Sequence, residues 1–467
     1  MAAEPGTGRD RRRRLGLWLG PALAVAVALL CARAGLAAPA ARCAGVAVLC
    51  AVFWITEALP IPVTSLIPFV AFPLLGVLDH EKAVAPLGDD LIVLLLGGFL
   101  LSKGVEKSLL HRRIAFVLVH TFHGLGRRGL VLGFMVATAA CSMWISNTAT
   151  VLVLLPVVLA VLEEDRDRTL RLPLLLGIAY AASIGGLGTK IGTPPNLVFI
   201  KEYERITGHE VDFVQWMAWG LPIVVLFLPI AWLWLTRGMQ RGPLPELPVL
   251  GPATAAERRV GWIFATTALL WILRSHPAGG WPTWLGLPPG AVGDETVALL
   301  GVLAMFLVPD GRGARLLDWE TARTIPWGLL LLFAGGIGLA RGFSESGLSA
   351  AIGDQLAAMK DWNHVLLIFA IALTVTFLTE ITSNTATTVL LMPILGSAAV
   401  GAGIEPRILM VPAVLSASFA FMLPVATAPN AIVFGTDRVG IEEMAREGLA
   451  LNLFGAVLTT ALVAVLA

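Results

Sequence analysis

Long apolar segments recur from one end of the chain to the other, and they set the first constraint on its fold. Clear examples lie at 15–30, 213–235, 325–340 and 449–467. An α-helix needs about 20 apolar residues to cross the hydrocarbon core of a bilayer. Only 14% of the 467 residues are charged, whereas soluble globular proteins carry about 25%. The sequence therefore predicts an all-α polytopic membrane protein, and it disfavours a β-barrel, whose strands alternate in short segments.

Eleven membrane-spanning helices and two re-entrant hairpins account for these segments. The predicted spans are 15–36, 43–59, 62–78, 89–107, 172–200, 212–236, 259–275, 291–309, 325–343, 406–434 and 446–467. The predicted re-entrant hairpins are 128–162 and 363–397.

The basic residues predict how the chain sits in the membrane. Arg9 and the four arginines at 11–14 precede the first span, and the positive-inside rule therefore places the N-terminus in the cytoplasm. Most of the 33 Lys and Arg residues fall on that side, and the C-terminus then lies outside. No small-residue cleavage site ends the first apolar run, so we expect a retained helix. The Ala-, Leu-, Gly- and Arg-rich composition suits a plasma membrane, specifically a bacterial inner membrane.

Several classes of chemistry lack their sequence signatures. The cysteines stand singly in apolar segments without ligand spacing, which disfavours disulfides and zinc; they are Cys31, Cys43, Cys50 and Cys141. We find no HExxH motif and no paired intramembrane aspartates, and the segment 335–342 lacks a full dinucleotide fingerprint. We therefore expect neither an enzyme nor an organic cofactor, and nothing in the near-neutral net charge of +1 points to nucleic acid.

Three pairs of matching segments run in the same order through the two halves of the chain. They are 94–110 with 331–349, SNTAT at 146–150 with SNTAT at 383–387, and GTPPN at 192–196 with ATAPN at 426–430. Collinear matches of this kind indicate an internal repeat. An odd number of predicted helices separates equivalent elements, so the halves have opposite orientation, as in inverted-repeat secondary transporters.

The repeat divides the chain into four parts. Residues 1–42 hold the N-terminus and first helix, and 43–236 form the first repeat. A Pro-rich cytoplasmic linker follows at 237–258, and the second repeat is 259–467.

The repeated polar segments interrupt helices at membrane depth. SNTAT splits each hairpin into two arms of about 15 residues, too short to cross the core, so we place it at the hairpin tip. Prolines in GTPPN and ATAPN break the spans 172–200 and 406–434. Freed backbone groups survive there only beside protein or water. The four breaks predict one central site, with helix N-termini for an anion and carbonyls for small cations. The competing interpretation is that Ser, Thr and Asn only join helices.

The paired SNT motifs, together with GTPPN, ATAPN and WITEALPIPVTS at 54–65, resemble the divalent-anion/sodium symporter family over nearly the whole chain. Its members carry succinate, malate, fumarate, citrate or sulfate. The resemblance implies sodium-coupled symport of a di- or tricarboxylate by a homodimer, with a scaffold domain and a moving elevator domain that holds the hairpins and broken helices. The absence of a large cytoplasmic insert favours carboxylates over sulfate. A sodium-independent exchanger on the same fold remains an alternative, as does a sulfate transporter.

The resemblance also implies the site residues. Substrate would be held by Ser146, Asn147, Thr148, Ser383, Asn384, Thr385, Thr193, Pro194 and Thr427, with Asn196 and Asn430 completing the walls. One sodium would take Ser142, Ser146, Asn147 and Gly192. The other would take Thr379, Ser383, Asn384 and Ala426. The spacing agrees, because Ser142 and Thr379 each lie four residues before a motif serine, on the same helical face.

Two charged residues near these motifs need a partner. Lys190 lies three residues before Thr193. It either reaches the central site, where it would replace a sodium ion or pair with a substrate carboxylate, or it points away from that site. In the second case it pairs with an acidic side chain or extends to the membrane interface. Glu380, three residues before the second motif, is protonated, pairs with Lys190, or bonds a helix end.

Overall fold

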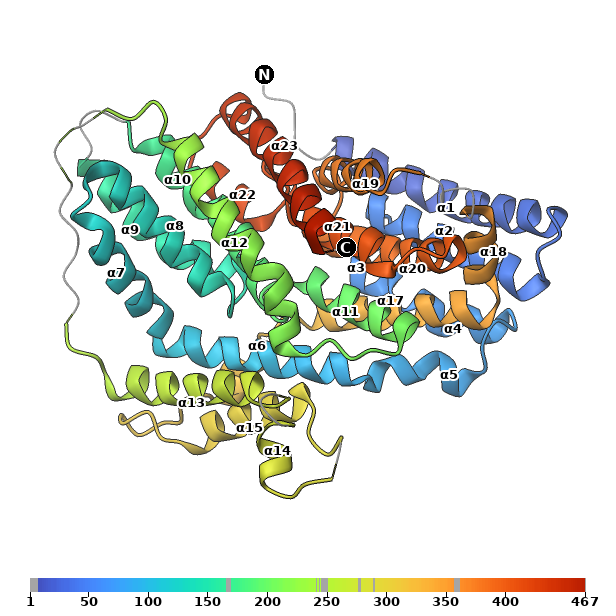
Figure 1. Cartoon of the computed structure of the whole chain (residues 1–467), viewed down its shortest axis with the longest axis horizontal. Helices are drawn as coiled ribbons and strands as arrows, with labels where there is room; N and C mark the ends of the chain where they lie inside the picture. The colour runs from blue at the N-terminus through green and yellow to red at the C-terminus, as the bar shows by residue number, and fades with distance from the viewer. Residues whose placement is uncertain are drawn as a thin grey trace.

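The computed structural model describes residues 7–164, 169–240, 242, 244, 251–275, 279–288, 290–356 and 362–466. Within these ranges the fold is helical, with an isolated β-bridge between Pro309 and Arg315 as its one β-type pairing (Figure 1). Eight helices of the described chain are long and apolar enough to cross a membrane. The prediction of an all-α polytopic membrane protein is therefore confirmed.

The first half of the chain is built from helices of very unequal length. In order they are α1 (Thr7–Arg33), α2 (Ala38–Thr56), α3 (Ile61–Thr64), α4 (Ile67–Leu74), α5 (His80–Val84), the 3-10 helix η1 (Ala85–Gly88), α6 (Asp90–Ser108), α7 (Leu110–His123), α8 (Gly126–Ser142), α9 (Asn147–Glu164), α10 (Arg171–Gly185), η2 (Gly186–Gly188), α11 (Pro194–Thr207) and α12 (Phe213–Leu235).

The second half continues in the same way. Its helices are α13 (Ala255–Ile272), α14 (Gly280–Trp284), α15 (Asp294–Leu307), α16 (Trp319–Ala322), α17 (Trp327–Glu345), α18 (Leu348–Leu356), α19 (His364–Thr379), α20 (Asn384–Ala402), α21 (Pro406–Ser416), α22 (Ala428–Phe434) and α23 (Ile441–Leu466).

Some predicted spans are shorter than a membrane-crossing helix. The segment 291–309 contains α15, which has 14 residues and is therefore about 21 Å long at 1.5 Å per residue. The segment 62–78 contains α3 and α4, which together end at Leu74. The number of eleven spans stays a prediction. Parts of the predicted N-terminus and linker, 1–6, 241, 243 and 245–250, lie outside the described residues.

Each predicted hairpin is a pair of helices joined by a short turn. α8 ends at Ser142 and α9 begins at Asn147, while α19 ends at Thr379 and α20 begins at Asn384. Ser, Thr and Asn favour such breaks because their side chains compete with the backbone for hydrogen bonds. In both halves the first helix ends four residues before SNTAT, and the next helix begins at the asparagine of SNTAT.

The two broken helices have matching backbone geometry. Thr193 is extended (φ −142°, ψ 141°) before α11 begins at Pro194. Thr427 is extended in the same way (φ −139°, ψ 153°) before α22 begins at Ala428. A proline in the first helical turn suits this geometry, because its missing N–H would have no partner there. The prolines thus start new helices after each break.

Helices α8, α9, α12 and α22 pack around α10. Within Arg171–Gly188, 89% of the residues are buried. α13, α14 and α15 lie along one edge, beneath α6, and α1 with α2 lies at the opposite end of the long axis from α7, α8 and α9 (Figure 1). α10 and the interrupted helices are therefore enclosed by longer apolar helices.

The packing of α18 on α20 depends on two glycines in contact. A Cβ built on Gly401 would lie 2.2 Å from the backbone of Gly353. We expect Gly401→Val to lower the free energy of unfolding by about 1–3 kcal/mol, the usual cost of overpacking. Gly124→Val is the matched control, since nothing lies within 4 Å of its Cβ position. Thermal unfolding in detergent measures both; equal midpoints would contradict the packing argument.

Candidate functional site

A single cavity of about 940 Å³ collects both hairpin turns and both broken helices. The predicted residues that line it are Ser146, Asn147, Thr148, Gly192, Thr193, Pro194, Ser383, Asn384, Thr385, Ala426 and Thr427. The opposite wall comes from the end of α2, from α6 and from the start of α17. Segments far apart in the sequence therefore meet at one site, as the repeat predicts.

Four helix N-termini face this cavity. α9, α11, α20 and α22 begin at residues that line it: Asn147, Pro194, Asn384 and Ala428. The first backbone N–H groups of a helix have no partner within the helix, and the helix dipole makes this end positive. The cavity therefore offers a positive field from backbone groups alone.

Ionisable side chains are scarce around the cavity. Of the described residues that line it, only Arg12 and Glu57 are ionisable. The described residues also contain no group of three or more His, Cys, Asp or Glu that could hold a metal ion. A neutral, hydroxyl- and amide-rich wall with four helix N-termini suits a bound anion.

Behind each asparagine lies a tight cluster of oxygen atoms. Ser142 Oγ lies 2.7 Å from both Asn147 Oδ1 and the Ala182 carbonyl oxygen. A hydroxyl group has one proton to donate, so in this orientation of Asn147 it serves only one of these two acceptors at a time. Three oxygens that share one proton form a suitable place for a small hard cation, which oxygen ligands bind.

The second half repeats this cluster. Thr379 Oγ1 lies 2.5 Å from Asn384 Oδ1 and 2.9 Å from the Ala417 carbonyl oxygen. Ser142 and Thr379 are both fully buried, so they lie behind the cavity wall rather than on it. The expectation that each shares a helical face with its motif serine is not met, because α8 ends at Ser142 and α19 ends at Thr379, and Ser146 and Ser383 lie in the turns that follow. Their contacts are with the motif asparagines instead.

Two asparagines hold the broken loops in shape. Asn196 Nδ2 donates to the carbonyls of Gly186 and Thr189, at 3.0 and 2.8 Å. Its counterpart Asn430 donates to Ala420 and Leu423, at 2.9 and 3.1 Å. Neither side chain lines the cavity, and both are fully buried. The prediction that Asn196 and Asn430 complete the walls is therefore wrong: they satisfy carbonyls that the interruptions free.

Gly192 is required by close backbone approach. A Cβ at this position would lie 2.4 Å from the Gly186 carbonyl oxygen and 3.0 Å from that of Met143. Its loop thus packs directly on the first hairpin turn, where Thr189 Oγ1 also donates to the Met143 carbonyl. In the second half, Ala426 stands at the matched position and lines the cavity.

Neither charged residue near the motifs lines the cavity. Lys190 Nζ lies 2.7 Å from Asp294 Oδ2, so of the roles left open it points away and pairs with an acid. Glu380 accepts hydrogen bonds from the backbone amides of Met422 and Leu423, at 2.8 and 3.0 Å. Its side chain thus secures the second broken loop and does not pair with Lys190.

Some contributors to the site could not be found from sequence motifs. The carbonyls of Ala182 and Ala417 complete the oxygen clusters, but any residue can supply a carbonyl. Trp144 lines the cavity beside the first turn and stacks on Phe213, with ring centroids 5.9 Å apart. The only sequence feature that could have placed Trp144 at the site is its position two residues before Ser146.

Comparisons with known proteins agree with this geometry. The family described as the sodium:sulfate symporter transmembrane region matches residues 13–466. The sodium-dependent dicarboxylate transporter SdcS of Staphylococcus aureus (strain NCTC 8325) is 39% identical over 433 residues, which cover 87% of this chain and 82% of that protein.

Two solved transporters share the fold at low sequence identity. The YdaH transporter of Alcanivorax borkumensis has a TM-score of 0.59 at 17% identity, covering 85% of this chain and 88% of that one. MtrF of Neisseria gonorrhoeae has a TM-score of 0.60 at 18% identity, covering 84% and 83%. At this identity the likeness concerns the fold alone.

Asn196 and Asn430, the two asparagine clamps of the broken loops, lead to a prediction about the stability of the protein. Asn196→Ala leaves two buried carbonyls without their donor, and each costs about 1–3 kcal/mol. We expect Asn430→Ala to destabilise the protein to a similar extent, because its contacts are the same. Asn363→Ala, which removes an exposed cap at the start of α19, serves as control at about 1 kcal/mol. Chemical denaturation in detergent gives the three values; clamp variants no less stable than the control would refute the assignment.

Proposed function

This chain belongs to the sodium:sulfate symporter family, and on that premise we propose that it carries a C4-dicarboxylate across the membrane together with sodium ions. The chain is an integral membrane transporter and not an enzyme. The observation that carries the proposal is the convergence of four helix N-termini on one cavity in which Arg12 and Glu57 are the only ionisable residues among the described lining. The identity to a sodium-dependent dicarboxylate transporter supports the choice of substrate.

The substrate would lie between the two SNT turns. Each turn offers an asparagine whose Oδ1 is already engaged by a hydroxyl, so its NH2 group is available to a carboxylate. The hydroxyls of Thr148 and Thr385, and the wall formed by Ser146, Ser383, Thr193, Pro194 and Thr427, add further donors and shape. Two similar turns that face one cavity suit a molecule with a carboxylate at each end.

Sodium would occupy the oxygen clusters behind the asparagines. The first would use Ser142, Ser146, Asn147 and Gly192, together with the carbonyl of Ala182. The second would use Thr379, Ser383, Asn384 and Ala426, together with the carbonyl of Ala417. A cation bound there would hold each asparagine oxygen and so orient its amide toward the cavity. We therefore propose that sodium binds first and the dianion second.

Alternating access is supported by a second cavity along the same helices. It measures about 410 Å³ and is lined by Val198, Lys201 and Arg205 of α11, and by α17 from Phe333 onward. The first cavity is lined by Pro194 and Pro195 of α11, and by Leu329 of α17. The two cavities thus adjoin different parts of the same two helices, α11 and α17. We propose that the hairpins and broken helices move past α6, α13, α15 and α17 to alternate access between the two cavities.

Several finer statements remain predictions of the family resemblance. These are the homodimer and the use of citrate. The inverted orientation of the halves, the domain boundaries and the cytoplasmic N-terminus likewise stay predictions, and they rest on the helix count, the repeat and the arginines near the N-terminus. Size-exclusion chromatography with light scattering tests the dimer, and competition by citrate tests the range of substrates.

Uptake of labelled succinate into proteoliposomes tests the function. We expect uptake with sodium outside and none with choline, and we expect Asn147→Ala and Asn384→Ala to reduce it at least tenfold. Asn363→Ala is the control, because its side chain lies outside the cavity. Uptake that ignores sodium but requires internal succinate would instead indicate an exchanger, and uptake of sulfate alone would refute the choice of carboxylate.

The second oxygen cluster predicts that one substitution on α19 weakens sodium binding, and the same helix offers a matched control. Thr379→Val removes the hydroxyl that contacts Asn384 and Ala417. We expect the sodium concentration for half-maximal uptake to rise about tenfold, since a tenfold loss corresponds to about 1.4 kcal/mol. Thr376→Val is the control, because Thr376 Oγ1 is buried without a hydrogen-bond partner in the described structure. Equal sodium dependence of the two variants would remove Thr379 from the site.

A further inference from the structure

A buried ion pair joins the first broken helix to α15. Lys190 Nζ lies 2.7 Å from Asp294 Oδ2 and donates to the Val211 carbonyl at 2.6 Å. Both charged side chains are 5% exposed. An ion pair removed from water is stable only while both partners remain in place. The pair therefore couples the position of the loop at Lys190 to that of α15.

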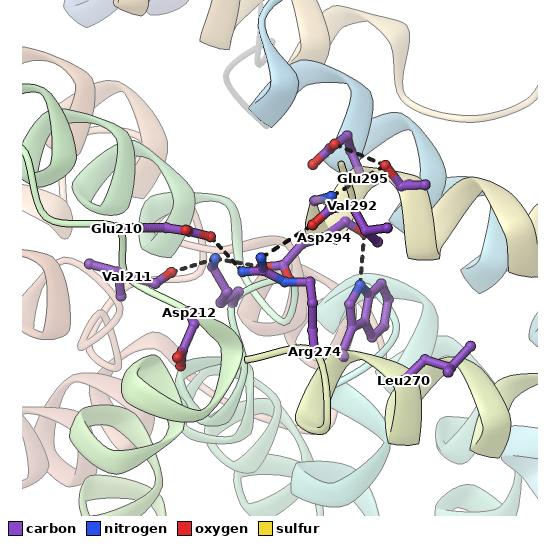
Figure 2. Close-up of polar contacts among 12 residues, drawn as sticks. Glu210, Val211, Asp212, Leu270, Arg274, Val292, Asp294 and Glu295 are labelled. Carbon is purple, nitrogen blue, oxygen red and sulfur yellow. Dashed lines mark hydrogen bonds and ion pairs between the residues drawn. The ribbon is translucent and has the colours of Figure 1, made fainter. Parts of the chain in front are cut away.

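The pair is the inner part of a longer chain of alternating charges. Arg274 Nε lies 2.7 Å from Asp294 Oδ1, and Arg274 Nη2 lies 2.5 Å from Glu210 Oε1 (Figure 2). Glu210 is 65% exposed, so the chain runs from the surface to the buried lysine. Trp271 Nε1 also donates to the Asp294 backbone carbonyl, at 2.8 Å. These contacts hold Asp294 on the side of α13 and α15.

The chain of charges crosses between two groups of helices. Lys190 lies two residues before Gly192, and Val211 and Glu210 lie in the loop between α11 and α12. Arg274 follows α13, and Asp294 begins α15. Two of the charged contacts, Lys190 with Asp294 and Glu210 with Arg274, therefore join a loop of the proposed moving part to the helices that it moves past. The third, Arg274 with Asp294, lies within the group of α13 and α15.

Aromatic rings cross the same boundary beside the charges. Phe213, at the start of α12, stacks on Trp271 of α13, with centroids 5.1 Å apart and planes 6° apart. Trp144 meets Phe264 of α13 edge to face at 5.3 Å. When the two groups of helices slide past each other, stacked rings keep part of their contact, because their attraction is spread over a large area. A buried ion pair that separates leaves each charge without its partner. The ion pair is thus the specific contact of the two.

We propose that the Lys190–Asp294 pair is a latch that positions the substrate-bearing loop in the state seen here and separates when that loop moves. The inference rests on the proposed function, which requires such movement. Asp294 keeps Arg274 as a partner after separation, whereas Lys190 loses its carboxylate. The cost of opening therefore falls on the lysine, and replacing the lysine should make opening easier.

Distances between two spin labels test the latch without any transport assay. One label replaces His209, on the loop between α11 and α12, and the other replaces Arg312, beyond the far end of α15; both are exposed. Cys31 is changed to Ser, since the other three cysteines are buried. Movement of the loop along α15 changes this distance. We expect one dominant distance in the otherwise unchanged protein, reconstituted in lipid.

Lys190→Met should raise the population of a second distance about tenfold, whereas Lys190→Arg should keep the original distribution. Lys103→Met is the matched control, because Lys103 lies 2.7 Å from Glu106 within the single helix α6. The same distribution for Lys190→Met and for the unchanged protein would overturn the latch. Failure of succinate uptake would count against the proposed function and leave this comparison intact.

A cross-link provides a second measurement if Lys190→Met does not fold. Cysteines at Glu210 and Arg274, joined by a short bifunctional thiol reagent, tie the loop to α13. We expect the link to stop uptake, with recovery on cleavage of the reagent. Each single cysteine treated with the same reagent is the control. Full uptake by the linked protein would show that the loop and α13 do not separate, and would overturn the proposal.

Discussion

The structure depends on how broken helices satisfy their backbone groups inside the membrane. A helix that ends at membrane depth exposes carbonyls and amides that water cannot reach. Asn196 and Asn430 bind two carbonyls in each broken loop, and Glu380 accepts from two amides. Residues of both turns and both broken loops also line the cavity. A requirement of folding thus leaves a set of donors and acceptors that a transporter can use for its cargo.

Charged side chains are scarce in the described lining of the cavity, which includes only Arg12 and Glu57, and others pair at contacts between elements. Lys190, Asp294 and Arg274 pair with one another beside α13 and α15. A fixed charge in the cavity would bind one ion strongly and release it slowly. Neutral hydroxyls, amides and helix ends bind a dianion more weakly, and the field they provide can be completed by mobile cations.

The sequence predicted the helical membrane fold and the place of each interruption, because these follow from local features. Apolar length, proline and the SNTAT pentapeptide act within a few residues of one another. The same features brought the motif residues to one cavity through the repeat. The pairing of Lys190 with Asp294 could not be predicted, because Asp294 lies in another helix and no sequence periodicity links the two residues. The inward direction of Asn196 and the carbonyls of Ala182 and Ala417 also depend on tertiary contacts, which a single sequence does not display.

The two halves match in geometry but differ in chemistry at corresponding places. Ser142 corresponds to Thr379, and Gly192 corresponds to Ala426. A site with two identical ends would accept a molecule in either direction with equal energy. Here Thr379 and Ala426 each carry one methyl group more than their counterparts, so the two ends are not identical. An unsymmetrical dicarboxylate would therefore have a preferred direction in the site, even though each end of the site recognises the same chemical group.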